Sequence, residues 1–109
     1  MARIARIMGA LCIMCAAIAP CHAATLGDSV LVCRSRTVME KLRAYAVAQD
    51  NVDFFRLLGA SNDICQTLNR GDDAAADAEQ SSGGLICVRT PDHPECRWAD
   101  ERQAGQSGL

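Results

Sequence analysis

The chain lacks an apolar run long enough to cross a membrane. Its longest apolar run, residues 7–19, is about 13 residues long and ends before Pro20, whereas a spanning helix needs about 20. Arg3 and Arg6 precede this run and small residues follow it, which is the order found in a cleavable signal peptide. We therefore expect residues 1–23 to be a signal peptide and the mature chain to have no integral membrane segment.

Concentrated positive charge is also missing. Without residues 1–23 the chain keeps nine basic and thirteen acidic residues, a net charge of −4. Nucleic-acid binding needs a dense set of basic side chains against the phosphates, so this charge argues against a nucleic-acid partner. A short basic stretch at residues 34–43 contains an acid as well, and we expect it to be a solvated helix face.

Groups that could act as catalysts are scarce in the mature chain. His93 is its single histidine and lies between two prolines in a predicted turn. A nucleophile needs a base beside it, and no free thiol remains near His93 once the cysteines pair. Adjacent acids such as Asp72 and Asp73 are typical of solvated turns. The sequence therefore predicts no catalytic residue and no enzyme.

The mature chain contains residue types that bind metals, but their spacing in the sequence does not favour a metal site. Cys87, His93 and Cys96 form a C-x5-H-x2-C array, with Cys65 as a potential fourth ligand. Structural zinc sites usually draw on cysteines two to four residues apart, and no such pair survives in the mature chain. The C-x-x-C-H motif of covalent haem is absent too. We predict no metal and no cofactor.

The cysteine count is the strongest positive signal. Three of the seven cysteines fall in the expected leader, and Cys33, Cys65, Cys87 and Cys96 remain. An even number of cysteines in a small exported chain predicts a closed set of disulfides. Four cysteines allow three connectivities, and the sequence favours Cys87 with Cys96 and Cys33 with Cys65.

This preference comes from a predicted hairpin. Residues 85–89 and 95–99 have the composition of strands, and residues 91–92 suit the centre of a type I turn. In the register that we infer, Cys87 lies directly opposite Cys96, at a separation where a disulfide forms. The same register has these further pairs: Arg89 with Pro94, Val88 with Glu95 and Leu85 with Trp98.

Residues 37–59 carry a helical pattern in two parts. Thr37 and Glu40 have the spacing of a capping box, which predicts the start of a helix at Thr37. Residues 49–51 supply a break and a new cap for a second helix. We expect that helix to close at Gly59, because glycine adopts the left-handed conformation after a helix without strain.

The predicted architecture is α+β, with two short helices followed by a small antiparallel β-meander that two disulfides hold together. We expect residues 24–100 to form one small domain and residues 101–109 to be a flexible tail. Residues 73–79 are ambiguous. They could add a third strand, but their run of alanines favours helix on propensity.

Three sequence runs carry a resemblance: CQTLNRGD at residues 65–72, GLICVR at 84–89 and WAD at 98–100. Their strand and turn pattern resembles the SH3-like small barrels of exported bacterial proteins, including small periplasmic proteins with two short helices before such a unit. The resemblance implies a binding or envelope-associated role. Residues 73–79 depart from it, because alanine is their only apolar residue type, and a three-stranded meander packed on helices follows more directly.

Together these features predict an exported, disulfide-stabilised binding or accessory protein of the bacterial envelope, periplasmic or secreted and not enzymatic. Its partner would be a protein or another envelope component. Two alternatives stay open at this point. One is a thiol-redox or metal-binding envelope protein that uses Cys87, His93 and Cys96. The other is a secreted effector or toxin-like protein.

Overall fold

A computed structural model describes residues 23–109 of the chain. The expected signal peptide, apart from Ala23, lies outside the described residues. The helices and strands follow in this order: β1 (Ala23–Thr25), β2 (Val30–Cys33), α2 (Arg36–Val47), α3 (Asn51–Ala60), β3 (Cys65–Leu68), β4 (Asp73–Ser82), β5 (Leu85–Thr90), β6 (His93–Asp100) and α4 (Glu101–Gln106).

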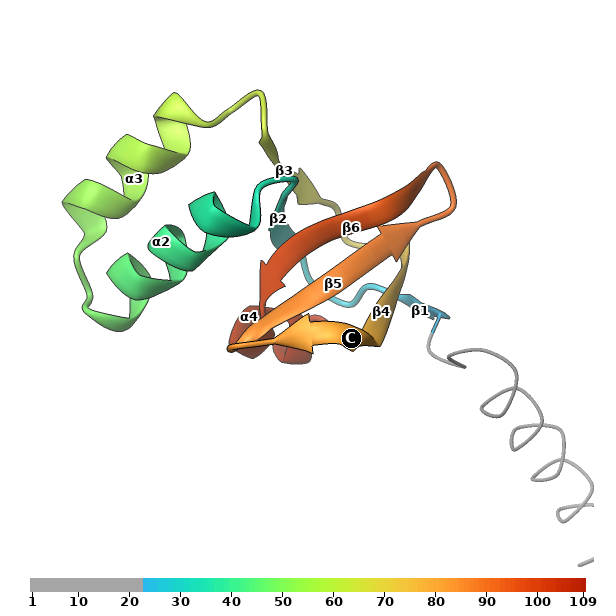
Figure 1. Ribbon diagram of the computed structural model, residues 1–109. Coiled ribbons are helices and arrows are strands. Elements are labelled where there is room, and N and C mark those ends of the chain that lie inside the picture. The colour runs from blue at the N-terminus through green and yellow to red at the C-terminus, as the bar shows by residue number, and fades with distance from the viewer. Residues whose placement is uncertain (1–22) are drawn as a thin grey trace, which may run out of the picture.

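All six strands belong to one sheet with the order β1-β4-β5-β6-β2-β3, and every neighbouring pair is antiparallel. The consecutive strands β4, β5 and β6 form the predicted meander. Helices α2 and α3 form a hairpin that projects from one side of the sheet. Helix α4 lies behind the lower end of the sheet in this view (Figure 1). The predicted α+β class is confirmed, with strands β1, β2 and β3 and a third helix in addition.

The sheet must curl, because the connection between β1 and β2 is too short for these strands to lie far apart. β1 stands at one end of the strand order and β2 next to the other end, yet only residues 26–29 join them. In a flat sheet, four strand spacings of about 4.8 Å would stretch such a link close to its limit. Leu26 binds back to the sheet through its backbone, donating to Asp72 O at 2.9 Å and accepting from Gly71 N at 2.9 Å.

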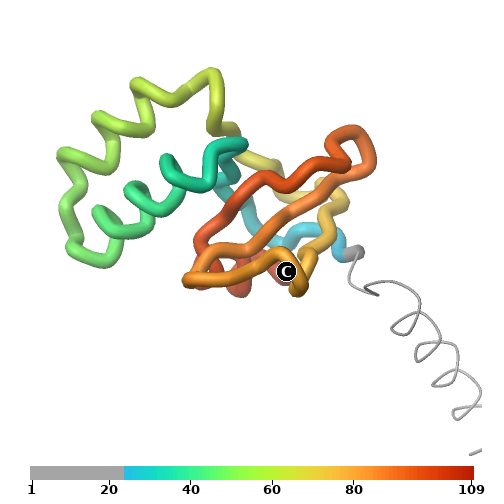
Figure 2. The backbone as a smooth tube through the Cα atoms, viewed as in Figure 1, coloured from blue at the N-terminus to red at the C-terminus, as the bar shows by residue number. Residues whose placement is uncertain are grey.

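The helical hairpin is an insertion between two paired strands. The chain leaves the sheet after β2, runs through α2 and α3, and returns at β3 (Figure 2). β2 and β3 are antiparallel neighbours in which Cys33 lies directly opposite Cys65. These cysteines form a disulfide with their Cα atoms 4.0 Å apart, which closes the base of the insertion.

Two apolar clusters make up the core. One lies inside the curled sheet and is closed by α4; its buried members are Leu26, Val30, Val32, Leu68, Ala74, Val88, Ala99 and Ala104. The other lies between the hairpin and the sheet; its buried members are Cys33, Met39, Leu42, Cys65 and Leu85. No residue of α3 is buried, so α3 packs only one face, against α2 and the sheet, with half-buried side chains.

The helix boundaries differ from the predicted ones at both ends. Ser35, and not Thr37, caps α2, since its side chain accepts a hydrogen bond from Val38 N at 3.2 Å. The predicted break and new cap are confirmed, because Asp50 accepts from the backbone of α3. Gly59 lies inside α3 and does not terminate it; its φ is not positive, unlike that of Gly83 or Gly84.

Residues 73–79, left open between strand and helix, are part of strand β4. Pairing with β1 on one side and β5 on the other overrides the helical propensity of its alanines, of which Ala74 is buried. β4 turns into β5 through Gly83 and Gly84, whose φ angles are 64° and 82°. Two positive φ values in a two-residue loop are the signature of a type I′ hairpin turn.

The β5–β6 hairpin exists, but its predicted register is wrong. Next to the turn, Thr90 pairs with His93, as a turn centred on residues 91–92 requires. Farther from the turn the pairs differ from the predicted ones, since Cys87 pairs with Trp98 and Leu85 with Asp100. The register shifts between these points, in the part of β6 that holds Pro94. Proline has no N–H to donate to the ladder, so pairing lapses there and β6 bulges.

Both predicted disulfides are nevertheless confirmed. Cys87 and Cys96 are joined with Cα atoms 5.0 Å apart. This separation is that of residues facing each other across a strand pair, so the register shift in β6 brings Cys96 as well as Trp98 next to Cys87. Two disulfides are consistent with an oxidising, extracytoplasmic location.

Residues 101–109, predicted to be a flexible tail, hold α4 and pack against the sheet. Asp100 caps α4 by accepting from Arg102 N at 3.1 Å. Ala104 and Ser107 are buried, with 0% and 1% of their surface exposed. Gln103 accepts a hydrogen bond from Leu31 N at 2.9 Å, which ties α4 to β2. Tertiary packing therefore orders this segment.

Candidate functional site

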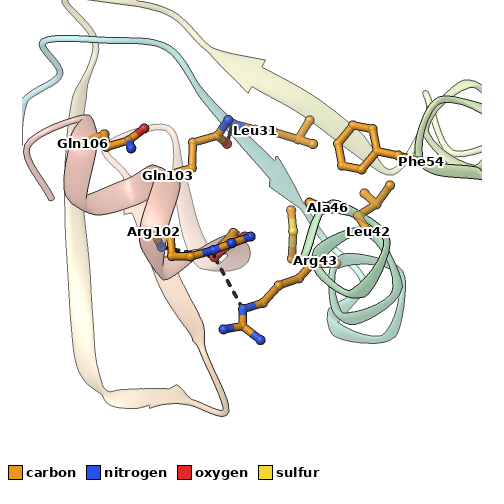
Figure 3. A pocket seen from close by; sticks show the side chains of 10 residues that line it. Leu31, Leu42, Arg43, Ala46, Phe54, Arg102, Gln103 and Gln106 are labelled. Atoms are coloured by element: carbon orange, nitrogen blue, oxygen red, sulfur yellow. Dashed lines mark hydrogen bonds and ion pairs between the residues drawn. The ribbon is translucent and has the colours of Figure 1, made fainter. Parts of the chain in front are cut away.

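A groove of about 310 Å³ runs between the helical hairpin and α4. Such a volume is at the small end of the range for ligand-binding clefts. Apolar side chains from β2, α2 and α3 form one wall, and α4 forms the other (Figure 3). Its lining comprises Leu31, Met39, Leu42, Arg43, Ala46, Phe54, Asp100, Arg102, Gln103 and Gln106.

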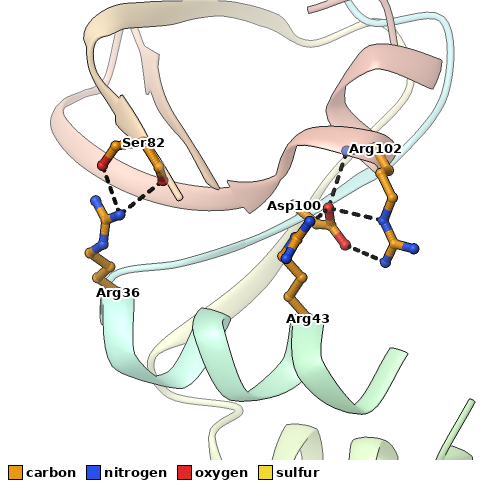
Figure 4. Close-up of polar contacts among 5 residues, drawn as sticks. All are labelled: Arg36, Arg43, Ser82, Asp100 and Arg102. Atoms are coloured by element: carbon orange, nitrogen blue, oxygen red, sulfur yellow. Dashed lines mark hydrogen bonds and ion pairs between the residues drawn. The ribbon is translucent and has the colours of Figure 1, made fainter. Parts of the chain in front are cut away.

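The rim of the groove carries a small ionic network. Asp100 accepts hydrogen bonds from Arg102 Nε at 3.4 Å and Nη2 at 2.8 Å. Arg43 approaches the same carboxylate from α2, with its Nε 3.4 Å from Asp100 Oδ1 (Figure 4). Two guanidinium groups and one carboxylate leave a net charge of +1 at this end of the groove.

Arg43 is only partly satisfied by this network. Its Nε is buried and, among the residues that the structure describes, makes no hydrogen bond. Its guanidinium lies against Gly84, where a Cβ atom would be only 2.5 Å from Arg43 Cζ. The buried Nε cannot reach a ligand, but 31% of the Arg43 side chain is exposed, so its terminal nitrogens are the donors that it can offer.

Opposing effects set the pKa of Asp100. Burial raises the pKa of this carboxyl, but the hydrogen bonds from Arg102 and the charges of Arg102 and Arg43 together outweigh burial and lower it below its ordinary value. Asp100 therefore stays ionised at neutral pH. A permanent anion between the two arginines holds them in place and leaves the rim cationic.

A second contact of α2 with the sheet fixes the position of the hairpin. The guanidinium of Arg36 lies 4.5 Å from the centre of the Trp98 ring, as in a cation–π pair. Its Nη2 also donates to Ser82 O and Ser82 Oγ, each at 2.9 Å (Figure 4). Trp98 is half-buried. Arg36 and Arg43 therefore contact the sheet, which corrects the expectation of a solvated basic face.

The sequence missed this role of the basic residues although a signal was present. Arg36, Met39 and Arg43 lie at i, i+3 and i+7, a spacing that places them on one face of α2. The apolar residues Val38, Leu42 and Tyr45, spaced at i, i+4 and i+7, lie only partly on that face. Met39 and Leu42 are the residues of α2 that are buried.

The cysteines and the histidine singled out by the sequence do not form a reactive cluster. Cys87 and Cys96 are bonded to each other, as are Cys33 and Cys65. His93 lines a separate cavity of about 260 Å³ that it shares with Cys65 of the other disulfide. Across residues 23–109 there is no group of three or more histidine, cysteine or acidic residues arranged to hold a metal ion.

Apolar side chains are also exposed at the tip of the helical hairpin. Within the described part of the chain, the large hydrophobic residues with most of their surface exposed are Val47, Val52 and Phe55, at 55%, 67% and 65%. Phe55 packs edge-on against Phe54, which lines the groove from the other side. The groove and the tip therefore meet at a pair of aromatic rings.

None of the helices in residues 23–109 has both the length and the apolar character needed to cross a membrane. No protein-family model, curated protein or solved structure matches the chain. The candidate site is therefore interpreted from its own geometry.

Proposed function

We propose that this chain is an exported, disulfide-stabilised binding or accessory protein of the bacterial envelope, periplasmic or secreted, and that it acts without catalysis. Its binding site is the groove between α2, α3 and α4. The observation that carries the proposal is this groove of about 310 Å³, apolar along one wall and cationic at its rim. An apolar cleft with a few fixed polar groups is the usual form of a small-ligand site.

Further features support this role. Both disulfides fit a protein that works outside the cytoplasm and needs cross-links to stabilise a small core. The sequence resemblance to SH3-like units of exported proteins points to the same class of binding role. Metal binding by Cys87, His93 and Cys96 would need free thiolates, and the disulfide between the two cysteines leaves none. A thiol-redox role of the same cysteines is compatible with this disulfide as its oxidised state.

Recovery of the protein from its compartment tests this proposal. The full-length gene is expressed in a Gram-negative host, and the protein is released by osmotic shock and analysed by native and denaturing mass spectrometry. We expect a chain shortened by the leader, no free thiols, and a bound small molecule visible under native conditions.

Two variants block the groove from opposite walls. Ala46→Trp fills it from α2, and Gln106→Trp fills it from α4 at an exposed position that leaves the hairpin core intact. Both are expected to lose the bound molecule while folding as the wild type does by circular dichroism. Retention in the cytoplasm, two or more free thiols, or no bound molecule in the wild type would refute the proposal.

A further inference from the structure

The groove has two chemically different ends, and this difference restricts what it can bind. One end is lined by Met39 and Leu42, which are 2% and 1% exposed, and by the half-buried Phe54. The other end is the rim with Arg43 and Arg102. A ligand that matches both ends must itself be apolar at one end and anionic at the other.

The charge at the rim sets the sign of the matching head group. Asp100 offsets one of the two arginine charges, and Glu101 also acts on Arg102. The donors that the two arginines keep free are cationic, and they call for a negatively charged group on the ligand. Arg102 is 51% exposed at its side chain and Arg43 is 31% exposed, so both guanidinium groups can be reached from outside. Guanidinium groups donate charge-assisted hydrogen bonds to carboxylates. Arg102 already gives Nε and Nη2 to Asp100, and the Nε of Arg43 is buried, so the terminal nitrogens that remain are the donors for a ligand.

The apolar wall sets the character and the size of the tail. It is formed by aliphatic and aromatic side chains, and about 310 Å³ leaves room for a short tail only. Gln103 is already engaged with Leu31 N, which fixes the α4 wall and keeps the groove open. Gln106 adds a neutral polar group on the same wall.

We propose that the groove binds a small amphiphile with one carboxylate head and a short apolar tail, with Arg43 and Arg102 holding the head and Leu31, Ala46 and Phe54 contacting the tail. This inference rests on the binding role proposed above and names the ligand class for the same groove. Asp100 keeps the two arginines apart, so the head group binds beside it and does not displace it.

Titration of the mature, oxidised protein with octanoate below its micelle concentration tests the inference by heteronuclear NMR. We expect saturable shifts that map to the backbone of Leu31, Ala46 and Phe54. Acetate lacks the tail, octanol lacks the charge and octylamine reverses it. Each of these probes is expected to bind at least about tenfold more weakly than octanoate, the equivalent of one charge-assisted contact.

Single variants separate the head contacts from general effects on the fold. Arg102→Gln and Arg43→Gln should each weaken octanoate binding about tenfold, whereas Arg70→Gln, at an exposed position away from the groove, should leave it unchanged. Arg102→Gln is the decisive variant, because Arg102 is half exposed and contributes nothing to the core. Circular dichroism checks that each variant folds.

Three results would each overturn the inference. Octanol binds as tightly as octanoate, Arg102→Gln binds octanoate with wild-type affinity, or the wild type does not bind octanoate. These failures differ from failure of the proposed function. If octanoate does not bind but the groove-blocking variants still lose the molecule that copurifies with the wild type, the groove binds a ligand of another class. If no molecule copurifies, the binding role itself is wrong.

Discussion

The disulfide at the base of the helical insertion should contribute more to stability than the one in the hairpin. Cys33 and Cys65 are 32 positions apart and enclose a ring of 33 residues, whereas Cys87 and Cys96 are 9 apart and enclose 10. In the chain-entropy description, a cross-link restricts the unfolded chain in proportion to the logarithm of ring size. The larger ring is then worth about 3.7 kcal/mol and the smaller about 2.7 kcal/mol.

The double variants C33A/C65A and C87A/C96A test this difference. Each removes two sulfur atoms, so the loss of buried volume is similar and the contrast between them reports ring size. Equilibrium urea unfolding, followed by circular dichroism, gives the free energy of unfolding by linear extrapolation. We expect the first pair to cost about 1 kcal/mol more than the second. Both variants should also have a larger m value, because an unfolded chain without its cross-link exposes more surface.

The opposite order would refute this reasoning. If C87A/C96A costs as much as C33A/C65A or more, the stabilisation does not come from restricting the unfolded chain. Since small domains are stable by about 5–15 kcal/mol in total, either loss is a large share of the margin. The variant without the larger ring should accordingly be the one that becomes sensitive to proteolysis at 37 °C.

Three further predictions concern single residues. The pKa of Asp100 is lowered in the folded state, so this carboxylate stabilises the fold above its unfolded pKa of about 3.9 and loses that contribution as the pH falls through its folded pKa. Asp100→Asn should therefore make the free energy of unfolding depend less on pH below about pH 4, and an unchanged pH dependence would contradict this. Gly84→Ala places a side chain at φ 82° and 2.5 Å from Arg43 Cζ, so it should cost about 1–2 kcal/mol and weaken octanoate binding. Its control Gly83→Ala, at φ 64° and next to Arg36, should cost as much without affecting binding, and equal binding loss in both variants would disprove the link. Gly59→Ala, in the last turn of α3 with nothing within 4 Å of the added Cβ, should stabilise the fold by less than the roughly 1 kcal/mol of a helix interior. A lower melting temperature would show that the added methyl group clashes with a neighbouring group.

The disulfide pairing was predicted correctly, but the register that led to it was wrong. Two cysteines directly opposite each other were expected at Cys87 and Cys96, and this arrangement occurs instead at Cys33 and Cys65. The bulge around Pro94 shifts the register, yet it leaves Cys96 close enough to Cys87 for the disulfide to form. Strand propensity and turn type do not reveal where a ladder lapses.

The parts of the fold that escaped prediction are those that tertiary packing creates. The α4 segment contains Gly105 and is short, and it is ordered because Ala104 and Ser107 enter the core. β1 is three residues long and exists through its pairing with β4. Local sequence preference is weak in both segments, so the chain alone gave no signal for them.

The candidate groove could not be predicted from the sequence, for a related reason. Its lining comes from β2, both helices of the hairpin, the end of β6 and α4, which span residues 31–106. Arg102 reaches Asp100 through a local contact at the start of α4, but Arg43 is brought to the same carboxylate only by the packing of α2 on the sheet. The sequence indicated a binding role by class, and the fold was needed to locate it.

The insertion of α2 and α3 between two paired strands joins the hairpin to the chain of the sheet at one place. Its two ends are held by one cross-strand pair of cysteines, so the pairing of β2 with β3 does not depend on the length of chain between them, and the contacts of α2 dock the hairpin on the sheet separately. The helices could therefore change in sequence or length, and with them one wall of the groove, while α4 and the rim arginine on it stayed where the sheet places them. Variation in the hairpin would alter which tail is accepted, and the sheet with α4 would preserve half of the head-group contact.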